Sequence, residues 1–384
     1  AAAAVPGILV TLLTAPVLPA VARSLAGGTA LLLAGLEQTA LLGARLPGGA
    51  WITAPGWQSG IGWGLALAAG CWVIAGRPRA GHAGTRVAWL GAVVVWGHLG
   101  LAWYQRGTAG EGQLSLFFLS VGQGDAAAIR TPHGRWILVD AGPVGGGRDA
   151  GREVVAPFLL RHGARRIEAL LISHAHADHL GGAGSIMDRL TTGMAVEPAV
   201  PVPDSLYLAF LDRMEAEAIP WHRGRAGDHW TLDGVGFTVL HPDTSWAGWE
   251  EDLNEDSVVL LVEYRAFRAL LTGDAGLPVE RRLRGRVGHV DVLKAGHHGS
   301  RTATGPEWLA ELAPSAVVVS VGRNRYGHPA TATLARIAAV RAALWRTDRE
   351  GTVTVRTDGT RVRVEGRSRH QEFEAGPPRP AAAQ

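Results

Sequence analysis

Four potential metal ligands lie within six residues of one another in the second half of the chain. They are His174, His176, Asp178 and His179, in a run that reads SHAHADHLGG from Ser173. The run follows an apolar segment, residues 169–173, whose pattern predicts a buried strand. A strand end holds the first imidazole in place, and the turn after it can bring the other ligands to one spot. Because neutral His and ionised Asp suit a borderline divalent ion, the pattern predicts a metal site. An ordinary surface loop would account for only one or two of these residues.

Two further polar clusters follow apolar segments later in the chain. The first reads LTGD and ends at Asp274, and the second reads KAGHHGS and contains His297 and His298. A carboxylate between two cations can bridge them, and a histidine from the last loop can complete the second site. This is the two-metal arrangement used for phosphoryl and acyl hydrolysis. Alone, the first cluster would predict a common turn and the second a flexible loop, but together with the first run they predict two divalent metal ions.

Cysteine usage restricts the kind of metal site that the chain can form. Cys71 is the single cysteine, so the sequence excludes an intrachain disulfide framework and a thiolate zinc site. Any metal must therefore be held by His and Asp side chains.

The pattern from Leu114 onward predicts an α/β domain, because short β-rich runs alternate with longer amphipathic segments. The expected strands cover residues 114–121, 126–131, 136–140, 169–173, 236–240, 258–264, 269–272, 290–294 and 316–320. The expected helices cover residues 152–162, 184–190, 205–218, 306–312 and 331–340. We expect this domain to span 114–365 and the Pro- and Ala-rich tail, 366–384, to be disordered.

Residues 1–106 contain long apolar stretches instead of short alternating runs. Hydrophobic residues make up 47% of the chain and charged residues only 18%, which favours membrane contact. The apolar stretches 25–44, 60–76 and 87–104 are each close to the roughly 20 residues that cross a bilayer, so we expect transmembrane helices in contact with lipid. Buried core helices are the alternative. The stretch 5–22 contains three prolines and predicts a broken or interfacial helix.

The arginines at residues 77–86 predict the orientation of these spans. The positive-inside rule places this connection in the cytoplasm, so a linker at 107–113 would lead to a C-terminal domain on the extracytoplasmic side of the cell membrane. Because the chain begins at Ala1 rather than Met, we expect it to be a fragment of a longer multi-pass protein.

Several motifs resemble the C-terminal domain of the ComEC/Rec2 family of DNA-uptake proteins, within the metallo-β-lactamase superfamily. They are the ligand run above, Asp140-Ala141-Gly142, FLSVGQGD (118–125), NEDS (254–257), DVLKAGHHGS (291–300), GRNRYGHP (322–329) and TDREG (347–351). The resemblance covers about residues 114 to 355. It implies an αββα metallo-β-lactamase sandwich, preceded by transmembrane helices that form the end of a competence channel domain. It also implies DNA and other proteins of the competence machinery as partners.

The resemblance assigns roles to particular side chains. It makes His174, His176, Asp178, His179, Asp274 and either His297 or His298 the ligands of two divalent ions, zinc or manganese. Asp178 would also orient the attacking water. His328 would contact phosphate or protonate the leaving oxygen, although a structural role is equally open.

Two positions depart from the family pattern. Ser120 stands where the family commonly has Asp. The histidine expected between the first ligand run and Asp274 has no clear equivalent; the nearest position lies around 254–256, and His241, in a His-Pro turn, is the alternative. This loss would weaken one metal position or favour an oxygen-preferring ion such as manganese.

The resemblance implies that the function is that of a metal-dependent nuclease domain, which degrades the non-transforming strand during DNA uptake. Arg301, Arg323 and Arg325 are expected to hold phosphates, whereas Arg281, Arg282, Arg284 and Arg286 form either a second DNA track or a solvated face. A hydrolase for phosphorylcholine esters or lactones, and a domain that binds or gates DNA without cutting it, are the alternatives.

Overall fold

The computed structural model describes residues 4–45, 112–243 and 252–376. The chain divides into two compact units, residues 1–60 and 61–384. Each unit is described by itself.

Two helices form the described part of the first unit. They are α1 (Ala4–Thr14) and α2 (Pro19–Arg45). The break between them confirms the predicted interruption of the stretch 5–22, because proline lacks the N–H that an interior helical position needs. Pro19 stands at the first position of α2, where that N–H has no helical partner.

The predicted membrane spans are not confirmed by the part of the chain that the structure describes. None of its helices combines the length and the hydrophobicity that crossing a membrane requires. The stretch 25–44 lies within α2, whose sequence includes Arg23, Ser24 and the pair Gly27–Gly28. The stretches 60–76 and 87–104 lie outside the described residues.

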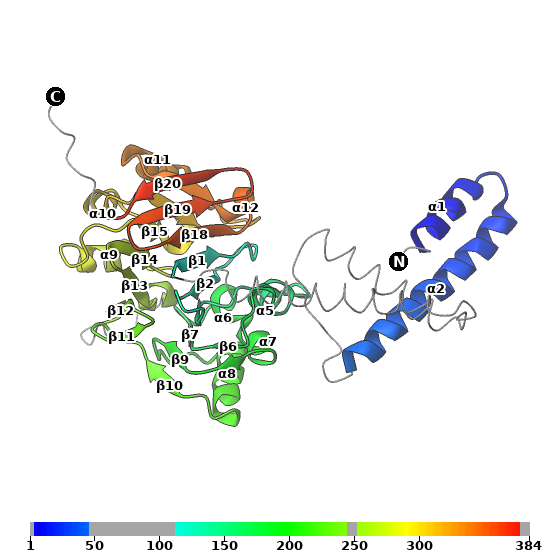
Figure 1. Cartoon of the computed structure of the whole chain (residues 1–384), viewed down its shortest axis with the longest axis horizontal. Helices are drawn as coiled ribbons and strands as arrows, with labels where there is room; N and C mark the ends of the chain where they lie inside the picture. The colour runs from blue at the N-terminus through cyan, green and yellow to red at the C-terminus, as the bar shows by residue number, and fades with distance from the viewer. Residues whose placement is uncertain (1–3, 46–111, 244–251, 377–384) are drawn as a thin grey trace, which may run out of the picture. The chain divides into compact units, whose positions relative to one another are not determined.

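The second unit contains two large sheets among its described residues. The nine-stranded sheet runs from β10 at the bottom of Figure 1 to β20 at the top. In spatial order its strands are β10 (Trp221–Arg223), β9 (Ala195–Glu197), β7 (Ala169–Leu171), β3 (Trp136–Val139), β2 (Ala127–Arg130), β1 (Leu114–Phe118), β18 (Val353–Thr357), β19 (Arg361–Glu365) and β20 (His370–Glu374).

The seven-stranded sheet is built almost entirely from the second half of this unit. In spatial order its strands are β11 (His229–Leu232), β12 (Val235–His241), β13 (Val259–Tyr264), β14 (Phe267–Leu271), β15 (Val292–Lys294), β16 (Ala316–Val319) and β17 (Ala343–Arg346). Two short pairs are β4 (Val144–Gly145) with β5 (Arg148–Asp149), and β6 (Arg166–Ile167) with β8 (Thr191–Thr192).

Helices cover the outer faces of both sheets. On the nine-stranded sheet they are α5 (Ala156–Arg161), which continues a π-helical turn at Gly151–Val155, α7 (Ala183–Met187) and α8 (Ser205–Ala216). On the seven-stranded sheet they are α9 (Leu277–Leu283), α10 (Pro306–Leu312) and α11 (Thr331–Ala339). The short helices α6 (Ala177–Leu180) and α12 (Thr347–Glu350) follow strands β7 and β17.

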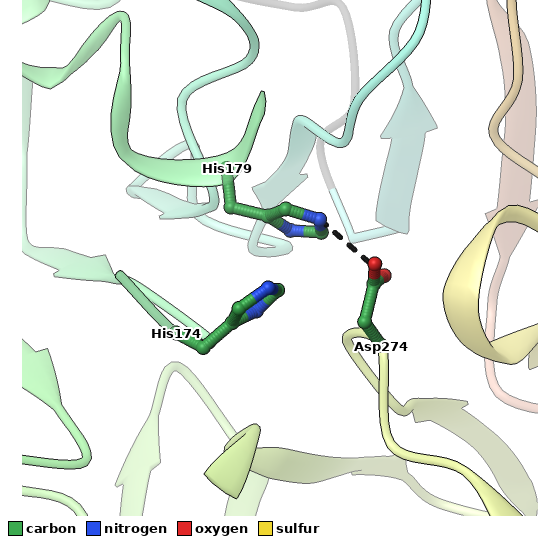
Figure 2. Close-up of side chains that lie close together, drawn as sticks. All are labelled: His174, His179 and Asp274. Atoms are coloured by element: carbon green, nitrogen blue, oxygen red, sulfur yellow. Dashed lines mark ion pairs between the residues drawn. The ribbon is translucent and has the colours of Figure 1, made fainter. Parts of the chain in front are cut away.

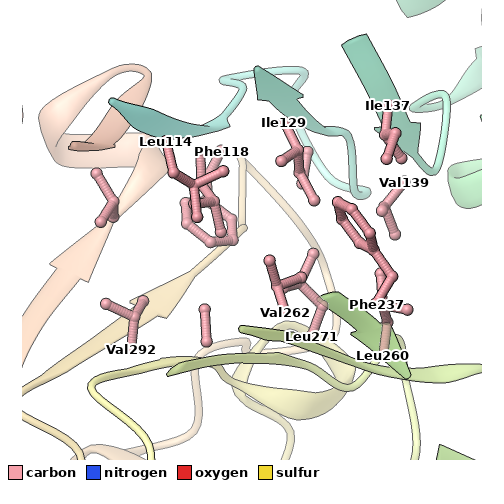
Figure 3. Close-up of a cluster of buried hydrophobic side chains, with 14 of the residues drawn as sticks. Leu114, Phe118, Ile129, Ile137, Val139, Phe237, Leu260, Val262, Leu271 and Val292 are labelled. Atoms are coloured by element: carbon pink, nitrogen blue, oxygen red, sulfur yellow. The ribbon is translucent and has the colours of Figure 1, made fainter. Parts of the chain in front are cut away.

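The core is divided into three layers by the alternation of side chains along the strands. Leu114, Leu116 and Phe118 of β1 point between the two sheets, whereas Phe117 packs on the side of α5. Phe237 and Leu260 meet the same central layer from the seven-stranded sheet (Figure 3). Because the two sheets share this central layer and helices pack on the outer face of each, the unit is the αββα sandwich that the resemblance implies.

All nine strands and all five helices expected in this domain are present within a few residues of their predicted bounds. The prediction of a disordered tail from residue 366 is wrong for residues 370–374. These residues form β20, which pairs with β19 from His370 opposite Glu365 to Glu374 opposite Arg361. Alternating Val and Phe side chains in these strands bury one face, and their charged neighbours form ion pairs on the other. Residues 377–384 lie outside the described residues.

Gly273 allows three loops to approach one another at the edge of the sandwich. Its φ is +52°, and a Cβ atom there would lie 2.8 Å from Ser173 Cβ and 2.9 Å from Ser257 Cβ. Real side chains do not tolerate such contacts, so glycine is required. The loops that follow β7, precede β13 and follow β14 therefore meet at one point.

Glu280 ties α9 to the loop that follows the His-His-Gly-Ser turn. Its buried carboxylate accepts hydrogen bonds from the backbone N–H groups of Thr304 and Gly305, the second at 2.8 Å. Burial raises the pKa of Glu280 to about 7, although the two N–H donors oppose that shift. The folded chain therefore binds more protons than the unfolded chain between about pH 4.5 and pH 7.

The Glu280→Gln variant is expected to lose part of the pH dependence of stability. A raised carboxyl pKa makes the native state less stable as the pH rises through this window, because burial opposes ionisation. The free energy of unfolding of the wild-type chain should fall from pH 4.5 to pH 8 by about 2–3 kcal/mol more than that of the variant. Urea unfolding at the two pH values measures this difference. Parallel pH profiles for the two proteins would contradict it.

Candidate metal centre

A polar cavity of about 320 Å³ opens at the edge of the sandwich where these loops meet. Its walls come from the loop after β1, from α6, from the turn before β13 and from the loops after β14, β15 and β16. The lining residues are Gln123, His176, Ala177, Asp178, Asn254, Asp274, His297, His298, Tyr326 and His328. The cavity thus collects most of the predicted site residues.

The first ligand run folds as predicted from its position after a strand. His174 follows the end of β7 and is 1% exposed, and His179, in α6, is fully buried. His174 Nε2 lies 2.9 Å from His176 Nδ1. A strand end followed by one helical turn therefore places three imidazoles side by side.

The carboxylate of Asp274 is directed toward the imidazole of His179 (Figure 2). Its Oδ1 is 3.3 Å from His179 Nε2, and its Oδ2 is 3.4 Å from His298 Nε2. The same His298 nitrogen lies 3.3 Å from Asp178 Oδ2. Each oxygen of Asp274 thus faces a different imidazole, which is the arrangement that a bridging carboxylate needs.

The structure distinguishes His298 from His297. The side chain of His298 is 2% exposed, and its Nδ1 lies 3.0 Å from the carbonyl oxygen of Ser320, so that Nε2 points at Asp274. The side chain of His297 is 27% exposed, and its Nε2 lies 3.8 Å from Asp274 Oδ2. Both residues have positive φ, which turns the chain sharply and sends the two rings in different directions. The geometry therefore favours His298 as the ligand.

Replacing His298 by alanine is expected to weaken binding of Mn²⁺ by at least about 100-fold, since even loss of a group that merely supports a ligand costs 10- to 100-fold. The adjacent substitution His297→Ala is the matched control, and it should cost less than about tenfold. Calorimetric titration of the metal-free variants measures both affinities. The reverse order of the two losses would assign the ligand to His297.

Carboxylate and hydroxyl groups behind the cluster orient its imidazoles. His179 Nδ1 lies 2.9 Å from Asp140 Oδ2, and Asp140 Oδ1 accepts a 2.7 Å hydrogen bond from the Ser173 N–H. Since the Nδ1 proton of His179 is held by Asp140, its Nε2 is left to face Asp274. Such partners fix the tautomer of metal-binding histidines and raise their basicity.

Unsatisfied atoms show that the cluster fits a metal. His179 Nε2, His298 Nε2 and Asp274 Oδ1 are buried and make no hydrogen bond to any described residue. Ligand atoms of His174, His179 and Asp274 lie within 4.8 Å of one another, and those of Asp178, His179 and His298 do the same. The unsatisfied atoms face one another, at 3.3 Å for His179 Nε2 and Asp274 Oδ1, and a divalent cation held by these atoms would satisfy them. Two further groups, Asp125 with Asp274 and His298 and Asp125 with Asp140 and His179, overlap with these, so the side chains that could hold divalent ions gather at one place.

Burial and neighbouring charges shift the pKa values of the side chains in the cluster. Burial alone would lower the pKa of His179, but Asp274 and Asp140 raise it well above its ordinary range. Burial would raise the pKa of Asp274, but His298, His179 and Lys294 hold it well below its usual range. Without metal, these directions favour a protonated His179 facing an ionised Asp274. Because ligands must release these protons, metal binding here should be tighter at higher pH.

Asn254 takes the place of the absent histidine. Its Oδ1 lies 3.1 Å from His176 Nδ1 and faces the cavity. His241, the alternative, is fully buried and does not line the cavity. Its Nε2 lies 2.8 Å from the carbonyl oxygen of Glu255. Asn254 is therefore the described residue that stands nearest to the place of the absent histidine, and an amide oxygen there would suit an oxygen-preferring ion.

Sequence reasoning missed Lys294 and Asp125. The chain has 37 Lys and Arg residues, and Lys294 is the single lysine among them. It is the last residue of the apolar strand β15. Its buried ammonium pairs with Asp125, donates a 2.7 Å hydrogen bond to the carbonyl oxygen of Gly273 and lies 3.7 Å from Asp274 Oδ1. Burial alone would lower the pKa of Lys294, but Asp125 and Asp274 raise it. The isolated lysine in an apolar strand was the signal that could have identified it.

The remaining predicted residues lie at the rim or away from the cavity. His328 lines the cavity, with its ring centre 5.5 Å from that of His297. Ser120 contacts Thr347 and Thr352 and does not line the cavity. Arg281, Arg282, Arg284 and Arg286 are exposed outside the cavity, and Arg282 pairs with Asp243 at 2.7 Å.

Comparison with known proteins agrees with this geometry. Residues 119–323 match the model of the metallo-beta-lactamase superfamily. The chain is 29% identical over 261 residues to ComE operon protein 3 of Bacillus subtilis, an alignment that covers 64% of this chain and 33% of that protein. It is 30% identical over 248 residues to Recombination protein 2 of Haemophilus influenzae, covering 64% of this chain and 29% of that protein.

A third relative has the same extent of similarity. Competence protein ComA of Neisseria gonorrhoeae is 30% identical over 256 residues, which cover 66% of this chain and 33% of that protein. The chain thus spans about a third of the length of the curated relatives that it matches. The chain belongs to the metallo-beta-lactamase superfamily and, within it, to the ComEC/Rec2 family.

Proposed function

We propose that this chain carries the metal-dependent nuclease domain of a DNA-uptake channel and degrades the non-transforming strand. The observation that carries the proposal is Asp274, whose two buried oxygens face His179 and His298 at 3.3 and 3.4 Å. A carboxylate in this position can join two cations that act on one phosphodiester. The names of the relatives, which refer to recombination and competence, support DNA as the substrate.

Zinc or manganese ions held by His174, His176, Asp178, His179, Asp274 and His298 would supply Lewis acidity and a nucleophile derived from water at neutral pH. The chain itself would position that water and the substrate. Burial would raise the pKa of Asp178, but His298 and His179 hold it well below its usual range, so its carboxylate can accept a hydrogen bond from water. Asp178 is also partly exposed in the cavity wall, where water and substrate can reach it.

His328 and the nearby arginines would hold the substrate at the mouth of the cavity. His328 is half-buried in the cavity wall, and its ring lies against that of His297. It can therefore donate a hydrogen bond to a phosphate oxygen next to the metal ligands. Arg323 and Arg325 are exposed on the same loop, where they can neutralise the phosphates that flank the cleaved bond.

We further propose that the domain works on the extracytoplasmic side of the cell membrane, in contact with lipid and with other competence proteins. The arginines at 77–86 and the apolar stretches at 60–76 and 87–104 support this location from the sequence alone. These segments lie outside the described residues.

The purified 384-residue chain should cleave linear DNA when Mn²⁺ or Zn²⁺ is returned after chelation. The double variant His176→Ala, Asp274→Ala should lose that cleavage, whereas Leu208→Ala, an exposed substitution on α8 outside the cavity, should retain it. Unchanged cleavage by the double variant would refute the assignment. Metal-dependent hydrolysis of a lactone or a phosphorylcholine ester without DNA cleavage would identify another hydrolase of this fold, and DNA binding without cleavage would identify a gating domain.

A further inference from the structure

Tyr326 is a large aromatic residue left exposed at the mouth of the metal-centre cavity. Its relative exposure is 65%, yet it lines the same cavity as Asp274 and His298. Leu208 and Trp221 are the other large apolar side chains exposed in this domain, within its described residues, and neither lines that cavity. An exposed aromatic ring beside a polar reaction site is a surface available for substrate.

The loop that carries Tyr326 is held rigidly by Asn324. The backbone N–H groups of Tyr326 and His328 both donate to Asn324 Oδ1 at 3.0 Å. The Asn324 Nδ2 group donates to the carbonyl oxygens of Gly322 and His328 at 2.9 and 2.8 Å. Gly327 allows the tight turn with a φ of +76°. Because the loop is ordered before any ligand arrives, binding to its ring would require little further loss of conformational entropy.

A row of rings connects Tyr326 to the metal ligands. The Tyr326 ring stacks on His328 with 5.9 Å between ring centres and 24° between planes. His328 meets His297 edge-on at 5.5 Å, and His297 meets His298 at 6.2 Å. A flat group placed on Tyr326 would therefore lie a short distance outward from the reacting phosphate, where the neighbouring nucleotide of a chain would be.

Positive charge accompanies the exposed ring. The guanidinium of Arg325 lies over Tyr326, 5.9 Å from the ring centre, and both side chains are exposed. Sites that bind single-stranded nucleic acid combine an aromatic ring, which stacks on a base, with a cation that contacts the backbone. Bases within a duplex already stack on one another and cannot reach such a ring without being unpaired.

We propose that Tyr326 is a nucleobase subsite that stacks on an unpaired base next to the phosphodiester held at the metal centre. The inference rests on the proposed nuclease function and narrows its substrate to single-stranded DNA. Tyr326 acts as a specificity-determining residue, and its aromatic ring rather than its hydroxyl provides the contact.

The experiment compares binding of two fluorescein-labelled oligonucleotides to the metal-free chain by fluorescence anisotropy. One is oligothymidylate, and the other has the same length and phosphates but abasic sites in place of bases. Tyr326→Ala should weaken binding of oligothymidylate by roughly 5- to 100-fold and leave binding of the abasic strand unchanged, because stacking is lost and phosphate contacts are kept. Tyr326→Phe should bind like the wild-type chain, and Leu208→Ala serves as the surface control.

Equal affinities of wild-type and Tyr326→Ala chains for oligothymidylate would overturn the inference, as would equal losses on both strands. A second measurement, cleavage of oligothymidylate after addition of Mn²⁺, tests the proposed nuclease function separately from the base subsite. Base-dependent binding through Tyr326 without cleavage would refute the nuclease and retain the base subsite. Cleavage of oligothymidylate, with no effect of Tyr326→Ala on its binding, would support the nuclease and refute the base subsite.

Discussion

Replacing Asp274 by asparagine is expected to lower metal-dependent DNA cleavage by at least about a thousandfold. The carboxylate of Asp274 faces His179 with one oxygen and His298 with the other. An amide of the same shape offers one oxygen and no charge, so it cannot join two cations. Loss of that arrangement removes several kcal/mol of charge stabilisation in the transition state, and each 1.36 kcal/mol corresponds to a tenfold change in rate.

The effect of Asp274→Asn is measured as kcat/KM for a labelled DNA strand at saturating Mn²⁺, together with the metal content of the variant. Asp188→Asn is the matched control, because Asp188 is an exposed carboxylate that pairs with Arg213 away from the cavity. It should change kcat/KM by less than about twofold. An Asp274→Asn chain that retained cleavage within tenfold of wild type would show that the carboxylate of Asp274 is not required.

Replacing Lys294 by methionine is expected to destabilise the metal-free chain by about 3–5 kcal/mol, the cost of removing one partner from a buried ion pair. Methionine keeps the length of the side chain but leaves Asp125 and Asp274 without the ammonium between them. Divalent cations should restore part of the lost stability, because a bound cation stabilises only the folded state and offsets the same carboxylates. Urea unfolding with chelator and with Mn²⁺ measures both effects.

Leu293→Met is the matched control for Lys294→Met. Leu293 is the preceding residue of β15 and is 1% exposed in the outer core layer. Exchange of Leu for Met conserves volume and should cost less than about 1.5 kcal/mol, without any dependence on metal. If the two variants were equally stable, or if Mn²⁺ rescued neither, Lys294 would have no electrostatic role in the cluster.

The strands that position the ligands could be predicted because their signals are local. The segments that end at Leu171, Leu271 and Lys294 are short apolar runs, and polar ligands follow each of them directly. The sheets bring the loops after these strands to one edge, so the order of ligands in the sequence already indicated a shared site. Composition alone could not show that Val353–Thr357, Arg361–Glu365 and His370–Glu374 continue the sheet. Their many charged residues conceal the alternation that buries Val355, Val362 and Val364.

Other parts of the site depend on contacts between distant segments. The pairing of Asp125 with Lys294 joins residues far apart in the chain, and no spacing rule predicts it. The choice between His297 and His298 depends on two positive φ values and on the carbonyl oxygen of Ser320, which are properties of the folded loop. The sequence placed the nearest equivalent of the expected histidine around residues 254–256, and the fold shows that Asn254 is the one whose side chain approaches His176, at 3.1 Å.

Titration of Mn²⁺ into the metal-free 384-residue chain, with metal content and DNA cleavage followed in the same sample, tests the two-metal phosphodiesterase most directly. The chain is expected to bind two equivalents of Mn²⁺, the second more weakly than the first, and cleavage is expected to increase as the second equivalent binds. Full cleavage by the chelated chain, or a titration in which no Mn²⁺ or Zn²⁺ binds to the cluster, would contradict this expectation.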